Sequence, residues 1–209
     1  MGKGEQKLMT VIKKLKPQIH KLTGFTESEA KKFYQAALLC VETINMTEFH
    51  YRVAMFEWPG VGKKFKMTDK TNEQVYDHIM SGSDLFGWSD GDMDIDATIY
   101  FEADDTVGYT YATSIRTWIN RKFFFRWAPP KISGNIAHEY MHLLGYMHSA
   151  DWNETIIYTA PYGVGYIVAD IAAEIYKPSK HSPKNLARKL VCRGYGPFKK
   201  CDYEVVAID

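Results

Sequence analysis

The spacing of apolar residues predicts several helices in the first 82 residues. Thr26 followed by Glu29 is typical of a capping box, and the helix that it opens reaches about Asn45. Its apolar residues recur at helical spacing on one stripe, namely Ala30, Phe33, Ala37, Leu38 and Val41. A shorter helix is predicted over Glu48 to Phe56, and a third, capped by Thr71, runs to Gly82. This part of the chain is therefore expected to be helical.

The next part of the chain changes to β-prone residues and then returns to helix. Ala97 to Phe101 and Val107 to Tyr111 flank a turn, which predicts a hairpin, and Ser114 to Phe125 reads as a third strand. A helix that begins at Gly134-Asn135 carries the histidines, and a last helix covers Val164 to Tyr176. Mixed helices and strands of this kind predict an α+β domain.

The charge of the chain is balanced overall but unevenly placed. A net charge of +1 over 209 residues argues against a dedicated nucleic-acid binder. Residues 1–24 hold six lysines and one acid, so we divide the chain into a basic arm (1–24) and one domain (25–209). The segment from Asp84 to Asp105 holds eight acids and no base. Such runs are either solvated faces or arms that touch a membrane, a polymer or an acidic substrate.

The sequence has no apolar stretch long enough to span a bilayer, and no signal peptide is visible. Either the protein stays inside the cell or a leader has been removed; of these, we predict a secreted or extracellular protein. Cys40 is expected in the core, whereas Cys192 and Cys201 could close a short loop through a disulfide or remain thiols. The oligomeric state stays open.

One segment, from His138 to His148, carries the chemistry of the chain. In a helix, residues four apart lie on one face, so His138 and His142 point at a common position. Two fixed imidazoles favour Zn²⁺, and Glu139 leaves the same helix beside them, where it can act as a general base. Gly145 can adopt a positive φ, which ends the helix and returns His148 as a third ligand.

Three histidine ligands leave the fourth position of the metal open for water, which is typical of a catalytic site. The alternatives are histidines on an ordinary amphipathic helix, or a zinc site in which Glu139 has no catalytic part.

The run from His138 to His148 resembles the extended zinc-binding signature of the metzincin clan, which includes astacins, serralysins, matrixins and adamalysins. The resemblance implies a zinc endopeptidase with a small twisted sheet, an active-site helix and a C-terminal helix. It also implies a protein or peptide substrate that adds as a strand to the sheet edge above the metal. Ser114 to Phe125 or the preceding hairpin would provide that edge.

The chain departs from the clan in its Met-turn, because no methionine follows Met147. Ala160-Pro161-Tyr162 occupies the corresponding place, with Ala160 where the methionine would be. The resemblance places Tyr162 near the zinc as a second catalytic residue. An ordinary buried tyrosine is the alternative, and Tyr158 is a rival candidate.

The acids of Asp90 to Asp96 alternate as in calcium-binding loops. However, Ile95 and Phe101 stand where such a loop has glycine and glutamate, so an acidic surface loop is preferred over a Ca²⁺ site. The function predicted from the whole sequence is zinc-dependent hydrolysis of peptide bonds, with Glu139 as general base and acid. A non-proteolytic zinc-binding or toxin-like module that retains the metal site is the alternative.

Overall fold

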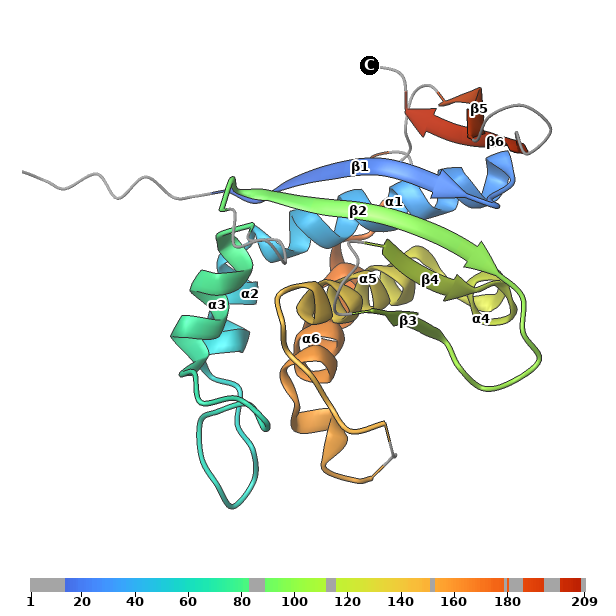
Figure 1. Cartoon of the computed structure of the whole chain (residues 1–209). Helices are drawn as coiled ribbons and strands as arrows, with labels where there is room; N and C mark the ends of the chain where they lie inside the picture. The colour runs from blue at the N-terminus through green and yellow to red at the C-terminus, as the bar shows by residue number, and fades with distance from the viewer. Residues whose placement is uncertain are drawn as a thin grey trace, which may run out of the picture.

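The computed structural model describes residues 14–82, 89–111, 116–150, 153–178 and 180, and the backbone of residues 186–193 and 200–207. Its strands form one mixed sheet in the order β3-β4-β2-β1-β6-β5 (Figure 1). The strands are β1 (Lys16–Thr23), β2 (Asp92–Tyr100), β3 (Gly108–Thr110), β4 (Arg116–Asn120), β5 (Leu186–Arg193) and β6 (Lys200–Ala207). β1, β2 and β4 are parallel, β3 runs antiparallel to β4, and the β5-β6 hairpin extends the sheet beyond β1.

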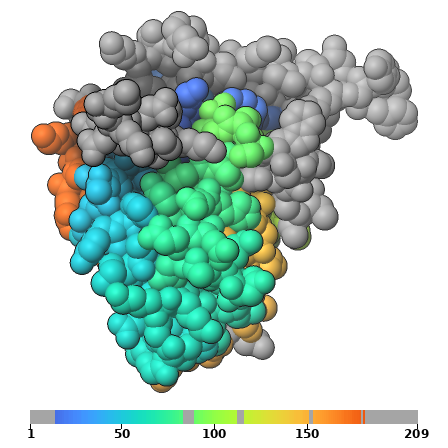
Figure 2. Space-filling view, turned by 90° about the vertical axis from the view of Figure 1, so that its left-hand side faces the viewer, coloured from blue at the N-terminus to red at the C-terminus, as the bar shows by residue number. Residues whose placement is uncertain are grey.

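The helices lie on one side of the β1-β2-β4-β3 sheet (Figure 1). They are α1 (Glu27–Ile44), α2 (Thr47–Ala54), α3 (Asn72–Met80), α4 (Arg121–Arg126), α5 (Pro129–Leu143) and α6 (Ala160–Ile175), with a short 3₁₀ turn, η1 (Ile156–Tyr158), before α6. α2, α3 and the segment between them form the face of the molecule seen in Figure 2. No helix of the described residues combines the length and hydrophobicity that a bilayer span requires.

Alternation along β2 separates the core from the outer face of the sheet. Met93, Ile95, Ala97 and Ile99 are buried, and the acids between them project from the opposite face. Asp94 there pairs with His20, and Asp96 pairs with Arg116. Most of the segment from Asp90 to Asp96 therefore lies in a strand. This corrects the prediction that the segment is a surface loop, and it gives no support to a calcium-binding loop.

The two helices that carry the predicted site pack closely through small residues. A Cβ placed on Gly134 of α5 would lie 2.5 Å from the carbonyl oxygen of Gly165 in α6. Ser133 adds a link to α1, since its hydroxyl donates to the carbonyl oxygen of Ala36 at 2.8 Å. α5 is thus fixed between α1 and α6 in the half of the helix that precedes the histidines.

The α+β class and the capped helices are confirmed. Thr26 and Thr71 each form a complete capping box at the start of α1 and α3. The last helix begins at Ala160 rather than Val164, because Pro161 fits its first turn. Likewise, Pro129 opens α5 five residues before the predicted start at Gly134.

Two strand predictions are wrong. β2 and β3 flank a turn but do not pair with each other, because β4 lies between them. The predicted strand from Ser114 to Phe125 begins outside the described residues, and from Arg116 on it is β4 followed by α4. The strand ends there because the side chain of Asn120 accepts from the amide of Lys122 and caps a helix.

The predicted basic arm also needs correction. Residues 16–23 form β1, which pairs along its length with β2 inside the sheet, while residues 1–13 lie outside the described residues. Cys40 is buried in the core, as predicted. Cys192 and Cys201 lie directly opposite each other in the backbone register of β5 and β6, and their disulfide stays a prediction.

Candidate metal centre

The three predicted histidines converge at the end of α5. The Nε2 atoms of His138, His142 and His148 lie 3.2 Å apart in each of the three pairs. Two imidazole nitrogens at ~2.0–2.1 Å from one zinc ion in tetrahedral geometry lie roughly 3.3 Å apart, so the donor set fits Zn²⁺. Within the described residues, these side chains are the only cluster of three or more histidine, cysteine or acidic groups that could hold a metal ion.

Backbone carbonyl groups fix the orientation of all three rings. Nδ1 of His142 donates to the carbonyl oxygen of Tyr146, and Nδ1 of His148 donates to that of Ser149, each at 2.8 Å. His138 hydrogen-bonds the backbone of Pro161, which can only accept because proline has no N–H. With Nδ1 protonated, each Nε2 keeps the lone pair that a metal requires.

The electrostatic setting favours the neutral form of His138 and His142. Burial, together with the neighbouring rings of His142 and His148, holds the pKa of His138 well below its usual range. Burial also lowers the pKa of His142 to about 4, although the Tyr146 carbonyl works in the opposite direction. A neutral imidazole is the form that binds a metal, so the pocket favours the ligand state.

Gly145 makes the turn that returns His148. It adopts φ +84°, and the chain leaves α5 after Leu143. The amide of Tyr146 then donates to the carbonyl oxygen of Met141 at 2.9 Å, which closes the end of the helix. The positive φ, which the sequence predicted for this position, costs a residue with a Cβ about 1–2 kcal/mol.

Glu139 lies under the edge of the sheet, with 3% of its surface exposed. Its Oε2 accepts from the hydroxyl of Thr110 in β3 at 2.8 Å, and Asn135 is a second hydrogen-bond partner. Burial raises the pKa of Glu139 to about 7, although both hydrogen bonds lower it. A dication nearby would favour the carboxylate and lower this pKa again.

Tyr162 lies against the histidines from the first turn of α6. Its ring is 4.5 Å from that of His138 and 4.9 Å from that of His148, measured between centroids. Burial raises the pKa of Tyr162, and Tyr166 and the negative charge of Glu139 add to this rise. Ala160 is buried beside it. The rival, Tyr158, instead packs on Phe56.

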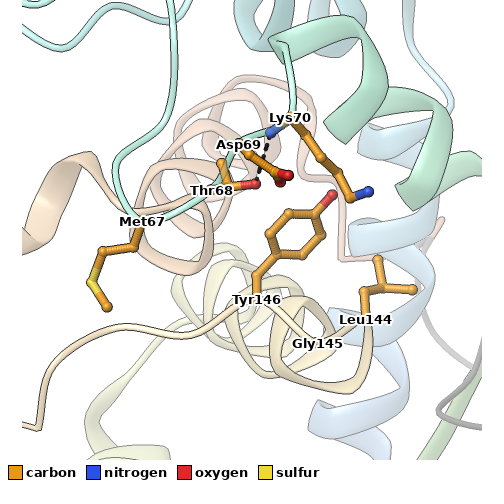
Figure 3. Close-up of a pocket in the computed structure, with 7 residues that line it drawn as sticks. All are labelled: Met67, Thr68, Asp69, Lys70, Leu144, Gly145 and Tyr146. Carbon is orange, nitrogen blue, oxygen red and sulfur yellow. Dashed lines mark hydrogen bonds between the residues drawn. The ribbon is translucent and has the colours of Figure 1, made fainter.

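A cavity lies beside the turn that follows α5. It measures about 360 Å³ and lies between residues 67–70 and the turn at Gly145, as Figure 3 shows. Neither Glu139 nor any of the three histidines lines it. Asp69 and the hydroxyl of Tyr146 point toward each other there, but the carbonyl of Tyr146 faces His142. The cavity is therefore separate from the metal centre.

Three supporting residues escaped the sequence analysis: Thr110, Asn135 and, for its carbonyl, Pro161. Asn135 lies four residues before Glu139, so helical spacing could have found it. Thr110 comes from a strand whose pairing was mispredicted, and no local pattern points to it. Comparison with protein families, curated proteins and solved structures finds no match for this chain.

Proposed function

We propose that this protein is a zinc-dependent endopeptidase of the metzincin type. The observation that carries the proposal is the triangle of Nε2 atoms at 3.2 Å, in which His138 and His142 lie on the same helix as the buried Glu139. Zinc held by three imidazoles supplies a Lewis acid and lowers the pKa of a water in its open position to ~7. The rings of all three histidines are hydrogen-bonded to backbone carbonyl oxygens, and each Nε2 therefore keeps a lone pair for the metal.

Glu139 is the general base and acid in this proposal. Its position in α5, directly after His138, keeps its carboxylate beside the metal centre. Thr110 and Asn135 hold the carboxylate in one orientation. From there it takes the proton of the attacking water and passes it to the leaving amine of the peptide.

Tyr162 is the second catalytic residue in this proposal. Its ring contacts two of the three histidines, which keeps its hydroxyl close to the reacting carbonyl group. A phenol that keeps its proton can donate a hydrogen bond to the carbonyl oxygen as that oxygen gains negative charge. Burial raises the pKa of Tyr162, so the proton stays on the phenol at neutral pH.

β3 supplies the edge on which a peptide substrate binds. Among the described residues it is the terminal strand of the sheet and pairs on one side only, with β4. Thr110 in this strand bonds directly to Glu139. A peptide added to the free edge of β3 is therefore carried past the catalytic carboxylate, and its backbone hydrogen bonds supply affinity without selecting its sequence.

The test is hydrolysis of unfolded casein by the zinc-loaded protein, followed by gel electrophoresis and mass spectrometry of the products. We expect internal cleavage that a chelator abolishes and that added zinc restores. The matched control is Glu139→Gln, which keeps all three ligands and removes the proton acceptor. Zinc binding without cleavage in the wild-type protein would favour a non-proteolytic zinc module and refute the proposal.

A further inference from the structure

Four aromatic residues form a continuous surface on the outer face of the sheet, at the same edge as β3. We call Tyr100, Tyr109, Tyr111 and Trp118 the aromatic shelf. Tyr109 and Trp118 are paired across β3 and β4 and stack at 5.2 Å between ring centroids, with planes 9° apart. Tyr111 meets Trp118 edge-on at 5.2 Å and is 57% exposed. The shelf therefore offers aromatic faces to an incoming group.

The shelf and the catalytic carboxylate lie on opposite faces of one strand. Thr110 points inward to Glu139, so its neighbours Tyr109 and Tyr111 point outward. A peptide paired with the free edge of β3 would alternate in the same way. Side chains that point away from the metal centre would then lie over Tyr109 and Tyr111.

The carboxylate of Glu102 lies beside the aromatic shelf, on a loop that hydrogen bonds hold in place. Asn120 is fully buried and bonds to the amide and carbonyl of Glu102 and to the carbonyl of Thr106, which fixes this loop. Lys122 binds the neighbouring Asp105. Within the described part of the chain, the exposed carboxylate of Glu102 has no hydrogen-bond or ion-pair partner.

The negative charge of this loop reaches the shelf. Burial and neighbouring groups, Tyr109, Glu102 and Asp104 among them, raise the pKa of Tyr100 to about 12. Burial, Tyr111 and Glu102 likewise raise the pKa of Tyr109. An aromatic surface in a negative potential attracts a cation over its rings.

We propose that the aromatic shelf and Glu102 form a subsite for a cationic side chain of the substrate, arginine above all. This inference rests on the proposed peptidase function and adds its selectivity. A planar guanidinium stacks on aromatic rings and pairs with a carboxylate at the same time. An apolar side chain would cover the rings but leave Glu102 unpaired.

The experiment compares arginine with citrulline, which has nearly the same shape and no charge. A series of peptides places arginine, in turn, at each position that flanks the scissile bond of a cleavable peptide. Each peptide is paired with a counterpart that has citrulline at the same position. We expect one position at which arginine raises kcat/KM roughly five- to tenfold, the range that a cation over an aromatic ring supplies. The same pairs are titrated against Glu139→Gln, with tryptophan fluorescence as the binding signal.

Two variants locate the effect, and two control for it. Tyr111→Ala and Glu102→Gln should bring the arginine-to-citrulline ratio close to one, and neither change affects a buried residue. The controls Tyr51→Ala and Glu57→Gln change exposed residues of the same types on and after α2, and they should keep the wild-type ratio.

The outcomes separate the two proposals. If no peptide is cleaved, the peptidase function fails, and the binding titration still decides the subsite. If peptides are cleaved but the ratio is near one at every position, or unchanged in Tyr111→Ala and Glu102→Gln, the subsite is wrong and the peptidase function stands. A preference for phenylalanine over arginine at the same position would also overturn the subsite and would indicate an apolar one.

Discussion

The contact between α5 and α6 at Gly134 allows the support of the metal centre to be tested quantitatively. In Gly134→Ala the new Cβ would lie 2.5 Å from the carbonyl oxygen of Gly165 and 2.7 Å from the Cβ of Ala169. Neither atom belongs to a flexible side chain that can rotate away. The helices must therefore move apart, and α6 carries the Pro161 carbonyl that holds His138.

The expected change in the free energy of unfolding of Gly134→Ala follows from two opposing contributions. Overpacking costs about 1–3 kcal/mol, and the upper part of this range applies because both separations are below 3.0 Å. Alanine is about 0.8–1.0 kcal/mol more favourable than glycine inside a helix. The net loss in the free energy of unfolding is about 1–2 kcal/mol, which lowers Tm by roughly 2–8 °C in a chain of this size. Disturbing the Pro161 hydrogen bond should also weaken zinc binding by about tenfold or more.

Thermal unfolding followed by circular dichroism and competition with a chromogenic zinc chelator measure the two effects. Gly134→Ala combined with Ala169→Gly is the matched control. It removes the collision with the Cβ but keeps the one with Gly165, and the glycine in α6 itself costs about 0.8–1.0 kcal/mol. The double variant should therefore lose less stability than the sum of Gly134→Ala and Ala169→Gly measured separately. A Gly134→Ala protein with wild-type Tm and wild-type zinc affinity would refute the reasoning.

The other predictions concern the metal centre itself. Protein purified without added metal should contain about one zinc per chain by elemental analysis, and a value near zero that zinc cannot raise would exclude the site. Glu139→Gln should lower casein hydrolysis by about 10²–10⁴-fold with zinc still bound, whereas wild-type turnover would mean that Glu139 is not the base. Tyr162→Phe should lower kcat more than zinc affinity, and an unchanged kcat would remove Tyr162 from the mechanism. Gly145→Ala should weaken zinc binding in the chelator assay, because φ +84° costs about 1–2 kcal/mol with a Cβ; unchanged affinity would show that the turn relaxes freely.

The cluster of three histidines could be predicted from sequence because its parts are close together in the chain. His138 and His142 are related by helical spacing, and Gly145 is required for the turn that brings back His148. Each of these relations spans a few residues and depends on backbone geometry alone. The same is true of the capping boxes at Thr26 and Thr71, which are complete in the structure.

The sheet could not be predicted in the same way, because its pairing is decided by distant segments. The turn between β2 and β3 resembles that of a hairpin, but β4 enters between them and pairs with both. β1 comes from a lysine-rich segment that looks like a solvated arm. The parallel partner that makes it a strand, β2, lies about 75 residues further along the chain.

Glu139 has one hydrogen-bond partner that is close in the chain and one that comes from a distant segment. Asn135 belongs to the same helix, whereas Thr110 is 29 residues away on the edge strand. The hydrogen bond from Thr110 therefore forms only when β3 has paired with β4 and α5 has packed beneath them. Likewise, the ring of His138 is held by a carbonyl of α6, not of its own helix. If the proposed function holds, zinc affinity should depend on the packing of α5 against α6, and the orientation of the Glu139 carboxylate should depend on the edge of the sheet. A change at either contact should alter one property and leave the other, which mutations at Gly134 and Thr110 can separate.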